Sequence, residues 1–449
     1  MLIRSRRDFL RATLRSVTAL GASGAMAKFG QMNALAQSGG SSYQALVCIF
    51  LSGGNDGHNT VVPIATAQQS FSVYQSARGA LGLPPSSLLP IHNGSDVYGL
   101  HPSLPEIQGL YNTGVAAVLA NVGMLVQPIN SAAYQTNNSS IVPNALFSHS
   151  DQAGQWQSSI PTGLANTGWG GRIADFLQSS NAGATFPAAT STNGSSLFLT
   201  GAQTFAANVP SGAPSVLNYG NSARLAGMQQ LLTFNNGLLL VQAANGTLAR
   251  GESFANALSA ALASSTPLAT QFPSGNPLAL QLQTVAQIIK VRGTLGLSRQ
   301  IFFCELDGFD THSGQLAIQA GLLPQLSQAV LAFYRATQEL GVDSNVTTFT
   351  TSEFGRSLTP NSTGTDHAWG NHHFVIGTGV KGGQFFGQFP SLALGNPYDA
   401  TGTGILIPTT AVDQYGATLA QWFGVGPANL PAIFPNIGNF PTTNLGILG

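Results

Sequence analysis

Nearly unbroken runs of strand-forming residues limit what this chain can fold into. The run at 43–51 reads YQALVCIFL, and further runs span 115–122, 301–306 and 346–351. A strand with one face in water alternates apolar and polar residues, whereas a strand covered on both faces does not need to. The four runs therefore predict strands that lie side by side, in some order, in one parallel sheet that is buried on both faces.

Segments with helical spacing separate these runs. The clearest are 102–113, 278–295 and 316–340. Alternating strands and helices predict an α/β fold, with a doubly wound, mainly parallel sheet and helices on both faces. We expect a single domain over 37–449, with a low-charge insertion or cap at about 187–277 that carries short strands at SLFLTG and GLLLVQ.

Charged residues are scarce. Asp, Glu, Lys and Arg make up only 7% of the 449 residues, against roughly 25% in an ordinary soluble domain. This scarcity excludes a nucleic-acid binder that reads through a basic face, whereas the 43% of hydrophobic residues suffices for a large core. Past the N-terminal region there is no run of about 18 uninterrupted apolar residues, so we expect no membrane-spanning segment in the mature chain.

The N-terminal region has the pattern of an export signal. Arg6 and Arg7 stand in SRRDFLR, a weakly apolar stretch follows at 17–26, and Ala34-Leu35-Ala36 precedes Gln37. This order is typical of a twin-arginine signal with a small-residue cleavage site. We therefore expect residues 1–36 to be removed and the mature protein to lie in the periplasm, outside the cell or at the cell surface.

Cysteine is rare, although the expected destination is oxidising. Cys48 and Cys304 each lie in a mostly apolar run, which favours two small buried side chains. A disulfide between neighbouring strands is the alternative.

Acidic and histidine side chains gather where the predicted strands end. Asp56 follows the first run, Asp310 and His312 follow the third, Glu353 follows the fourth, and His367 stands in DHAWGNHH. Carboxyl ends of parallel strands share one edge, where such a cluster is costly unless a cation or a hydrogen-bond network holds it. We expect these five residues to bind one divalent ion, which would be Zn, Ca, Mg or Mn. The alternative is that Asp and Gly only form strand-end turns.

Further polar residues beside these positions would orient the ligands. They are Asp307, Asp366, His372 and His373.

A set of motifs resembles a known family. FLSGGNDGHNTVVP, LFSHSDQ followed by Trp156, GWGGRIAD, GFDTHSGQ, SEFGR and DHAWGNHHFVIG with GVKGG after it are similar, in this order, to the domain-of-unknown-function 1501 family. That family looks like a distant branch of the alkaline phosphatase and sulfatase superfamily. The resemblance implies a metal site at the carboxyl ends of a parallel sheet, which would bind a phosphate or sulfate ester. It also implies that the metal ligands are Asp56, Asp310, His312, Glu353 and His367.

The chain also departs from the superfamily pattern. Phe354 follows Glu353 where members with two metals usually carry a histidine, which puts a second metal site in doubt. Ser148 is a candidate nucleophile, with His149 or a bound ion to activate it, although Ser150, Thr60 and His149 are comparably placed. Ser148 is equally suited to cap the helix that follows.

Arg356 has two readings. It would either pair with an anionic substrate as a bidentate fork or lock Glu353 in a structural ion pair.

Two functional classes remain from the sequence. The first is an exported metal-dependent hydrolase of a small-molecule or polymer-borne phosphate or sulfate ester. The second is a non-catalytic surface or secretion-associated protein that keeps the fold and a structural ion. The retained acids and histidines favour the first class, and Phe354 favours the second.

Overall fold

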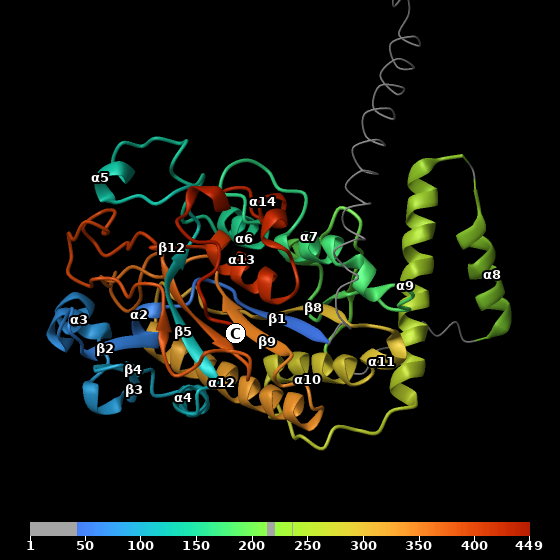
Figure 1. Cartoon of the computed structure of the whole chain (residues 1–449), viewed down its shortest axis with the longest axis horizontal. Coiled ribbons are helices and arrows are strands. Elements are labelled where there is room, and N and C mark those ends of the chain that lie inside the picture. The colour runs from blue at the N-terminus through green and yellow to red at the C-terminus, as the bar shows by residue number, and fades with distance from the viewer. Residues whose placement is uncertain (1–42, 213–220, 236) are drawn as a thin grey trace, which may run out of the picture.

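A central sheet of mainly parallel strands organises the chain (Figure 1). The computed structural model describes residues 43–212, 221–235 and 237–449, so the expected export signal lies outside the described residues. The strands are β1 Gln44–Leu51, β2 Val61–Ala65, β3 Leu89–Asn93, β4 Asp96–Leu100, β5 Ala116–Gly123, β6 Ala189–Ser191, β7 Ala206–Asn208, β8 Arg299–Leu306, β9 Val346–Thr351, β10 Asn371–Ile376, β11 Phe385–Phe386 and β12 Thr410–Ala411.

Helices lie on both faces of this sheet (Figure 1). They are α2 Gly57–Thr60, α3 Phe71–Arg78, α4 Pro105–Asn112, α5 Ser131–Tyr134, α6 His149–Ser158, α7 Trp169–Phe176, α8 Ser222–Thr233, α9 Leu239–Ala263, α10 Pro277–Lys290, α11 Arg292–Leu295, α12 Gln315–Glu339, α13 Val412–Trp422 and α14 Leu430–Ile433. The expected α/β class, with helices on both faces of a mainly parallel sheet, is confirmed.

The strand order is β11-β5-β10-β9-β1-β8-β6-β7, and β12 pairs with β5. The strands β9, β1, β8, β6 and β7 are parallel neighbours. All four predicted strands lie in this sheet, but only β9, β1 and β8 lie side by side, because β10 separates β5 from them. β10 runs antiparallel between β5 and β9, so its first residues lie at the edge where β1 and β9 end. A separate three-stranded sheet is formed by β2, β4 and β3.

The composition of β1 follows from its two covered faces. Val47 and Ile49 pack with residues of α10 and α12 in one hydrophobic cluster, whereas Leu46 and Phe50 pack in a second cluster with residues of α7 and α13. Successive side chains of a strand point to opposite faces. An apolar residue is therefore favoured at every position of this strand.

Helix α12 is the one helix of the described residues that is long and apolar enough to cross a membrane by length and composition. Leu323, Leu326, Val330 and Phe333 of this helix are buried in the main hydrophobic cluster. This burial explains the apolar composition of α12 by core packing.

The segment from 187 to 277 contributes both to the sheet and to a projecting hairpin. β6 and β7 extend the sheet beyond β8, while α8 and α9 stand out from the rest of the molecule (Figure 1). The prediction of short strands at SLFLTG and GLLLVQ is wrong. Leu197–Leu199 forms a 3₁₀ turn and Leu239 begins α9, because a short apolar run does not by itself distinguish strand from helix.

Candidate functional site

Loops that follow three parallel strands interlock at one edge of the sheet. The amide of Phe309, after β8, donates to the carbonyl of Ser52, after β1, at 3.0 Å. The amide of Gly53 donates to Oε1 of Glu353, after β9, at 2.7 Å. The carboxyl ends of β8, β1 and β9 thus bring their loops into contact, as the sequence predicts.

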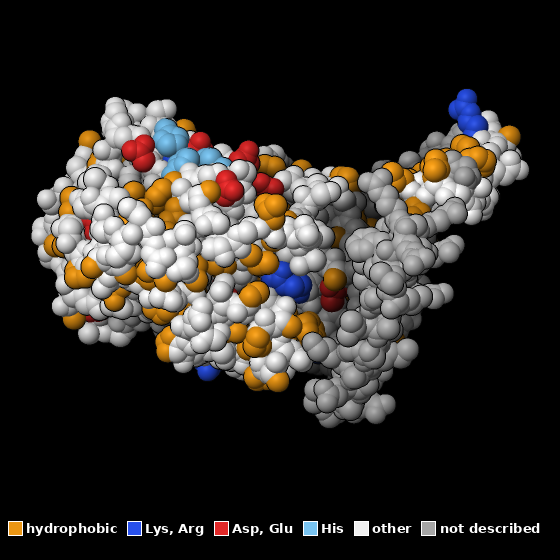
Figure 2. Space-filling view, turned by 90° about the horizontal axis from the view of Figure 1, so that it is seen from above, with side chains coloured by type: hydrophobic (Ala, Val, Ile, Leu, Met, Phe, Trp, Pro, Cys, Tyr) orange, Lys and Arg blue, Asp and Glu red, His pale blue; other side chains and the backbone are white. Residues whose placement is uncertain are grey.

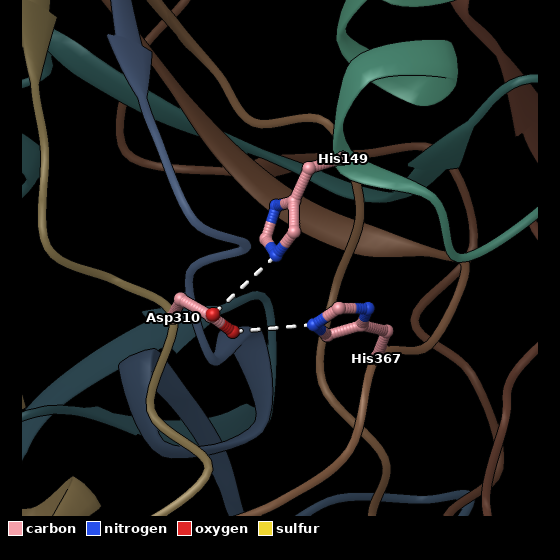
Figure 3. A group of neighbouring side chains, drawn as sticks. All are labelled: His149, Asp310 and His367. Carbon is pink, nitrogen blue, oxygen red and sulfur yellow. Dashed lines mark hydrogen bonds and ion pairs between the residues drawn. The ribbon is translucent and has the colours of Figure 1, made fainter.

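Asp310 lies at the centre of a cluster with His149 and His367 (Figure 3). Nε2 of His367 lies 3.2 Å from Oδ1 of Asp310, and Nε2 of His149 lies 3.5 Å from Oδ2. One potential ligand atom from each residue lies within 4.8 Å of the others. We call these three residues the triad.

Neighbouring groups hold the two imidazoles of the triad. His149 is the first residue of α6, and its Nδ1 lies 2.9 Å from Oε1 of Glu353. Nδ1 of His367 lies 2.7 Å from the carbonyl oxygen of Phe147, and its ring stacks on Phe354. Phe147 has a φ of +74°, a conformation that bulky residues rarely adopt. Such local strain is typical of functional sites.

These contacts assign the hydrogen on each ring. A carbonyl or carboxylate oxygen accepts from Nδ1 in both His367 and His149, so Nδ1 carries the hydrogen and Nε2 of the neutral ring is an acceptor. Both Nε2 atoms face the carboxylate oxygens of Asp310. Acceptors that face each other repel unless a proton or a cation lies between them.

Arg356 is buried behind the triad. Its guanidinium is 0% exposed and donates to the carbonyls of Gly54 at 3.0 Å and Thr365 at 3.0 Å, and to Asp310. Partial burial raises the pKa of Asp310, but the hydrogen bond and charge of Arg356 outweigh burial and lower this pKa to about 2. Asp310 is therefore ionised over the physiological pH range.

This position corrects both readings of Arg356. A side chain enclosed by carbonyl oxygens has no donor fork to offer a substrate, and the acid that it pairs with is Asp310 instead of Glu353.

His312 and Asp366 lie beside the triad at the surface. Nε2 of His312 lies 3.1 Å from Oδ1 of Asp310 and 2.8 Å from Nε2 of His367, so one hydrogen on this nitrogen serves both acceptors. Nδ1 of His312 lies 3.5 Å from Oδ1 of Asp366. His312 could instead bind an ion through Nε2 if its hydrogen moved to Nδ1, where Asp366 would accept it.

Asp56 is committed to other partners. It is buried, forms an ion pair with Arg78, and accepts from Nε2 of Gln315 at 2.5 Å. Its Oδ1 accepts from the amide of His58 at 3.1 Å, which caps α2. The buried cation Arg78 already neutralises this carboxylate, so the structure does not support the predicted ligand role of Asp56.

Ser148 occupies the N-cap position of α6, but it makes no capping hydrogen bond through its side chain. Its hydroxyl donates to Oδ2 of Asp151 at 2.5 Å. The ring nitrogens of His149 face Glu353 and Asp310. The expected partnership in which His149 activates Ser148 is therefore replaced by one in which His149 belongs to the triad.

The remaining predicted residues lie outside the triad. Asp307 is exposed. His372 and His373 are buried in β10, where Nδ1 of His372 accepts from the amide of Asn121 at 3.1 Å. Burial lowers the pKa of both histidines to about 3.

Two residues that matter here were not given these roles from the sequence. The sequence makes His149 a candidate base or nucleophile beside Ser148, and its place in LFSHSDQ marks it as part of a motif. Arg78 was not considered, and no local pattern singles it out. Its role follows only from the packing of α3 against the turn that contains Asp56.

The solved structures that match this chain share little sequence with it and have low TM-scores. A putative sulfatase from Bacteroides thetaiotaomicron is 11% identical, with a TM-score of 0.31, over 88% of this chain and 75% of the other. The lipoteichoic acid synthase LtaP from Listeria monocytogenes is 8% identical, with a TM-score of 0.31, over 82% and 75%. The C-terminal periplasmic domain of EcEptC from Escherichia coli is 9% identical, with a TM-score of 0.35, over 90% and 86%.

A search of curated proteins finds no match to this sequence. A family model does match, and it spans residues 43–413, which include all the strands and loops that build the triad. The chain therefore belongs to the family described as "Protein of unknown function (DUF1501)".

Proposed function

We propose that this protein is an exported metal-dependent hydrolase of a phosphate or sulfate ester. The observation that carries the proposal is the arrangement of three acceptors, in which Nε2 of His149 and Nε2 of His367 both face the carboxylate of Asp310. A divalent cation between them would be bound by all three acceptors. The motifs that resemble the alkaline phosphatase and sulfatase superfamily support the ester as substrate.

The chemistry of the donors narrows the choice of ion. Two imidazoles and one carboxylate suit Zn²⁺ or Mn²⁺ better than Ca²⁺ or Mg²⁺, which prefer oxygen ligands alone. Three protein ligands are the number typical of catalytic zinc sites, which keep a position open for substrate. The Asp310 side chain is 47% exposed, so an ester would reach this position from solvent.

Each residue of the site then has a defined task. A bound divalent ion would polarise the ester oxygen and stabilise its developing charge. Glu353 and the carbonyl of Phe147 keep the hydrogen on Nδ1 of His149 and His367, which leaves Nε2 free to bind. His312, 44% exposed and beside Asp366, is placed to give a proton to the leaving group.

Metal content of the purified mature protein tests the first half of the proposal. We expect about one Zn²⁺ or Mn²⁺ per chain by elemental analysis, and less than about a tenth of that in Asp310→Asn and His367→Gln. His92→Gln is the matched control, because His92 is an exposed histidine of β3 outside the triad. A metal-free wild type, even after incubation with the ions, would refute the proposal.

Turnover tests the second half. We expect the wild type to hydrolyse an aryl phosphate or an aryl sulfate, and the two ligand variants to lose at least about a hundredfold in kcat/KM while they stay folded. Ser148→Ala should abolish turnover only if its hydroxyl is the nucleophile. An ion that is present and stabilising, with no ester turned over, would support the non-catalytic alternative.

A further inference from the structure

Large apolar side chains cover the end of the hairpin formed by α8 and α9. This hairpin projects from the molecule, and Figure 2 shows hydrophobic side chains on it. The exposed fractions of the residues at its connecting end are 63% for Leu231, 57% for Phe234, 59% for Leu238, 81% for Leu239 and 85% for Leu240. We call these five residues the hairpin tip.

The hairpin tip stands within an uncharged stretch. Between Arg224 and Arg250 the chain has no Asp, Glu, Lys, Arg or His, and its polar residues there are amides, Thr233 and Thr247. A stretch without charge has nothing to pair with a charged protein partner. It also has no charge whose removal from water would oppose insertion into an apolar medium.

The hairpin satisfies several of its own polar groups at this end. Nδ2 of Asn245 donates to the carbonyls of Leu231 and Phe234, both at 3.1 Å. Oδ1 of Asn235 accepts from the amide of Gly237 at 2.9 Å and from Nε2 of Gln242 at 2.6 Å. A turn that enters a lipid surface must satisfy its backbone internally, because hydrocarbon offers no hydrogen bonds.

The size and shape of the hairpin tip favour lipid over a second protein surface. Five such side chains expose on the order of 500 Å² of apolar surface. A stable protein interface buries about 800 Å² on each partner and needs complementary shapes. A convex tip of smaller area meets this requirement poorly, but it enters a fluid lipid layer without needing a matching groove.

We propose that the hairpin tip docks this protein on a lipid bilayer by inserting Leu239, Leu240 and their apolar neighbours into the interface. Because the stretch carries no charge, a neutral zwitterionic bilayer is the expected partner. Figure 2 shows histidine and acidic side chains on the same face of the molecule as the apolar hairpin. This inference rests on the hairpin alone and does not depend on the proposed hydrolase activity.

Flotation of the mature protein with phosphatidylcholine vesicles tests the inference. We expect the wild type to float with the vesicles to the same extent at about 50 mM and about 500 mM NaCl. The double variant Leu239→Ser, Leu240→Ser should bind at least about tenfold more weakly. Leu164→Ser is the matched control, since Leu164 is 99% exposed but lies outside the hairpin. Leu239→Trp should show a blue-shifted emission when vesicles are added.

Four results would overturn it. The first is a wild type that does not float, and the second is binding that the double serine variant retains. The third is binding that needs anionic lipid and disappears in salt, because this would assign it to basic residues. The fourth is a wild type that light scattering shows to be a dimer, together with a double serine variant that is a monomer. This would assign the hairpin tip to contact with a second copy of the chain. Unchanged circular dichroism of the double variant is required for comparison.

Discussion

At the scale of single residues, the direction of a side chain on a strand determines which residues it can contact. Cys304 of β8 lies opposite Ile49 of β1, and Cys48 lies opposite Phe303. Because neighbouring positions on a strand face opposite ways, Cys48 packs in the cluster on one face of the sheet and Cys304 in the cluster on the other. The disulfide considered from the sequence is therefore excluded by the sheet.

We predict two free and unreactive thiols. Burial is the main cause that raises the pKa of both, to about 12 for Cys304, so neither forms a reactive thiolate at neutral pH. Iodoacetamide should label neither cysteine in the native protein and both in the denatured protein without any reductant, as read by mass spectrometry. Labelling that requires reductant would contradict this expectation.

Buried histidines make the fold sensitive to acid. Burial lowers the pKa of His58, His372 and His373 to about 3, against about 6.5 in an unfolded chain. Below about pH 6.5 the unfolded state therefore binds protons that the folded state does not, and the free energy of unfolding falls. Asp413, whose pKa burial raises to about 7, acts in the opposite direction, because its folded form keeps a proton that the unfolded form loses.

Burial also lowers the pKa of His101, to about 4, so four histidines outweigh one carboxyl group. With about three net protons taken up on unfolding, we predict that the free energy of unfolding falls by roughly 3–4 kcal/mol per pH unit between about pH 6 and pH 5. Urea unfolding of the chelator-treated protein at pH 7.5, 6.0 and 5.0 measures this free energy of unfolding. A free energy that stays constant or rises toward pH 5.0 would show that the histidines are hydrated or paired.

At the scale of elements, one turn places the triad. Gly53, after β1, has a φ of +111°, and a Cβ at this position would lie 2.3 Å from the amide nitrogen of Asp310. The turn after β1 and the loop after β8 can therefore approach only because residue 53 has no side chain. The geometry of Asp310 depends on this contact as much as on the strands.

We predict that Gly53→Ala impairs ion binding without removing any ligand. The added methyl group should displace Asp310 and weaken affinity for Zn²⁺ at least about tenfold, as loss of a supporting contact typically does. Gly94→Ala is the control, since Gly94 also has a positive φ, of +63°, but open space around its Cβ position. It should cost about 1 kcal/mol of stability and leave titrated affinity unchanged. Equal ion affinity in both variants would contradict the proposed role of the turn.

At the scale of the whole molecule, the charges that remain are concentrated where they act. Only 7% of residues are charged, yet Asp310, Glu353, Arg356 and Asp366 all lie around one edge of the sheet. The two ion pairs Asp56–Arg78 and Asp310–Arg356 anchor the turns that frame it. A chain so poor in charge thus uses buried cations to position acids.

The N-terminal region leads to a prediction for the whole protein. Arg6 and Arg7 lie in the pattern expected of a twin-arginine signal, whose recognition depends on the guanidinium groups. Changing both to Lys should keep most of the precursor in the cytoplasm. Cell fractionation measures this, together with the mass of the chain, which shows whether the N-terminal segment has been removed. Normal export of this double variant, with cleavage near Gln37, would disprove the assignment.

The sequence by itself determined the sheet and the edge at which the polar groups meet. Continuous apolar runs require a sheet with two covered faces. Asp310 and Glu353 each follow a parallel strand, so both lie at the same edge of that sheet whatever the conformation of their loops. The family motifs also placed His367 near these acids. These features depend on local patterns, which the sequence displays directly.

Only the tertiary structure decided which polar group meets which. Arg78 lies 22 residues from Asp56 and Arg356 lies 46 residues from Asp310, and no spacing rule links such pairs. The antiparallel direction of β10 and the burial of Arg356 depend on how elements pack, because side-chain partners are set by three-dimensional proximity. The sequence therefore specifies the edge of the sheet at which these polar groups meet, and packing selects His149, Asp310 and His367 to form the triad.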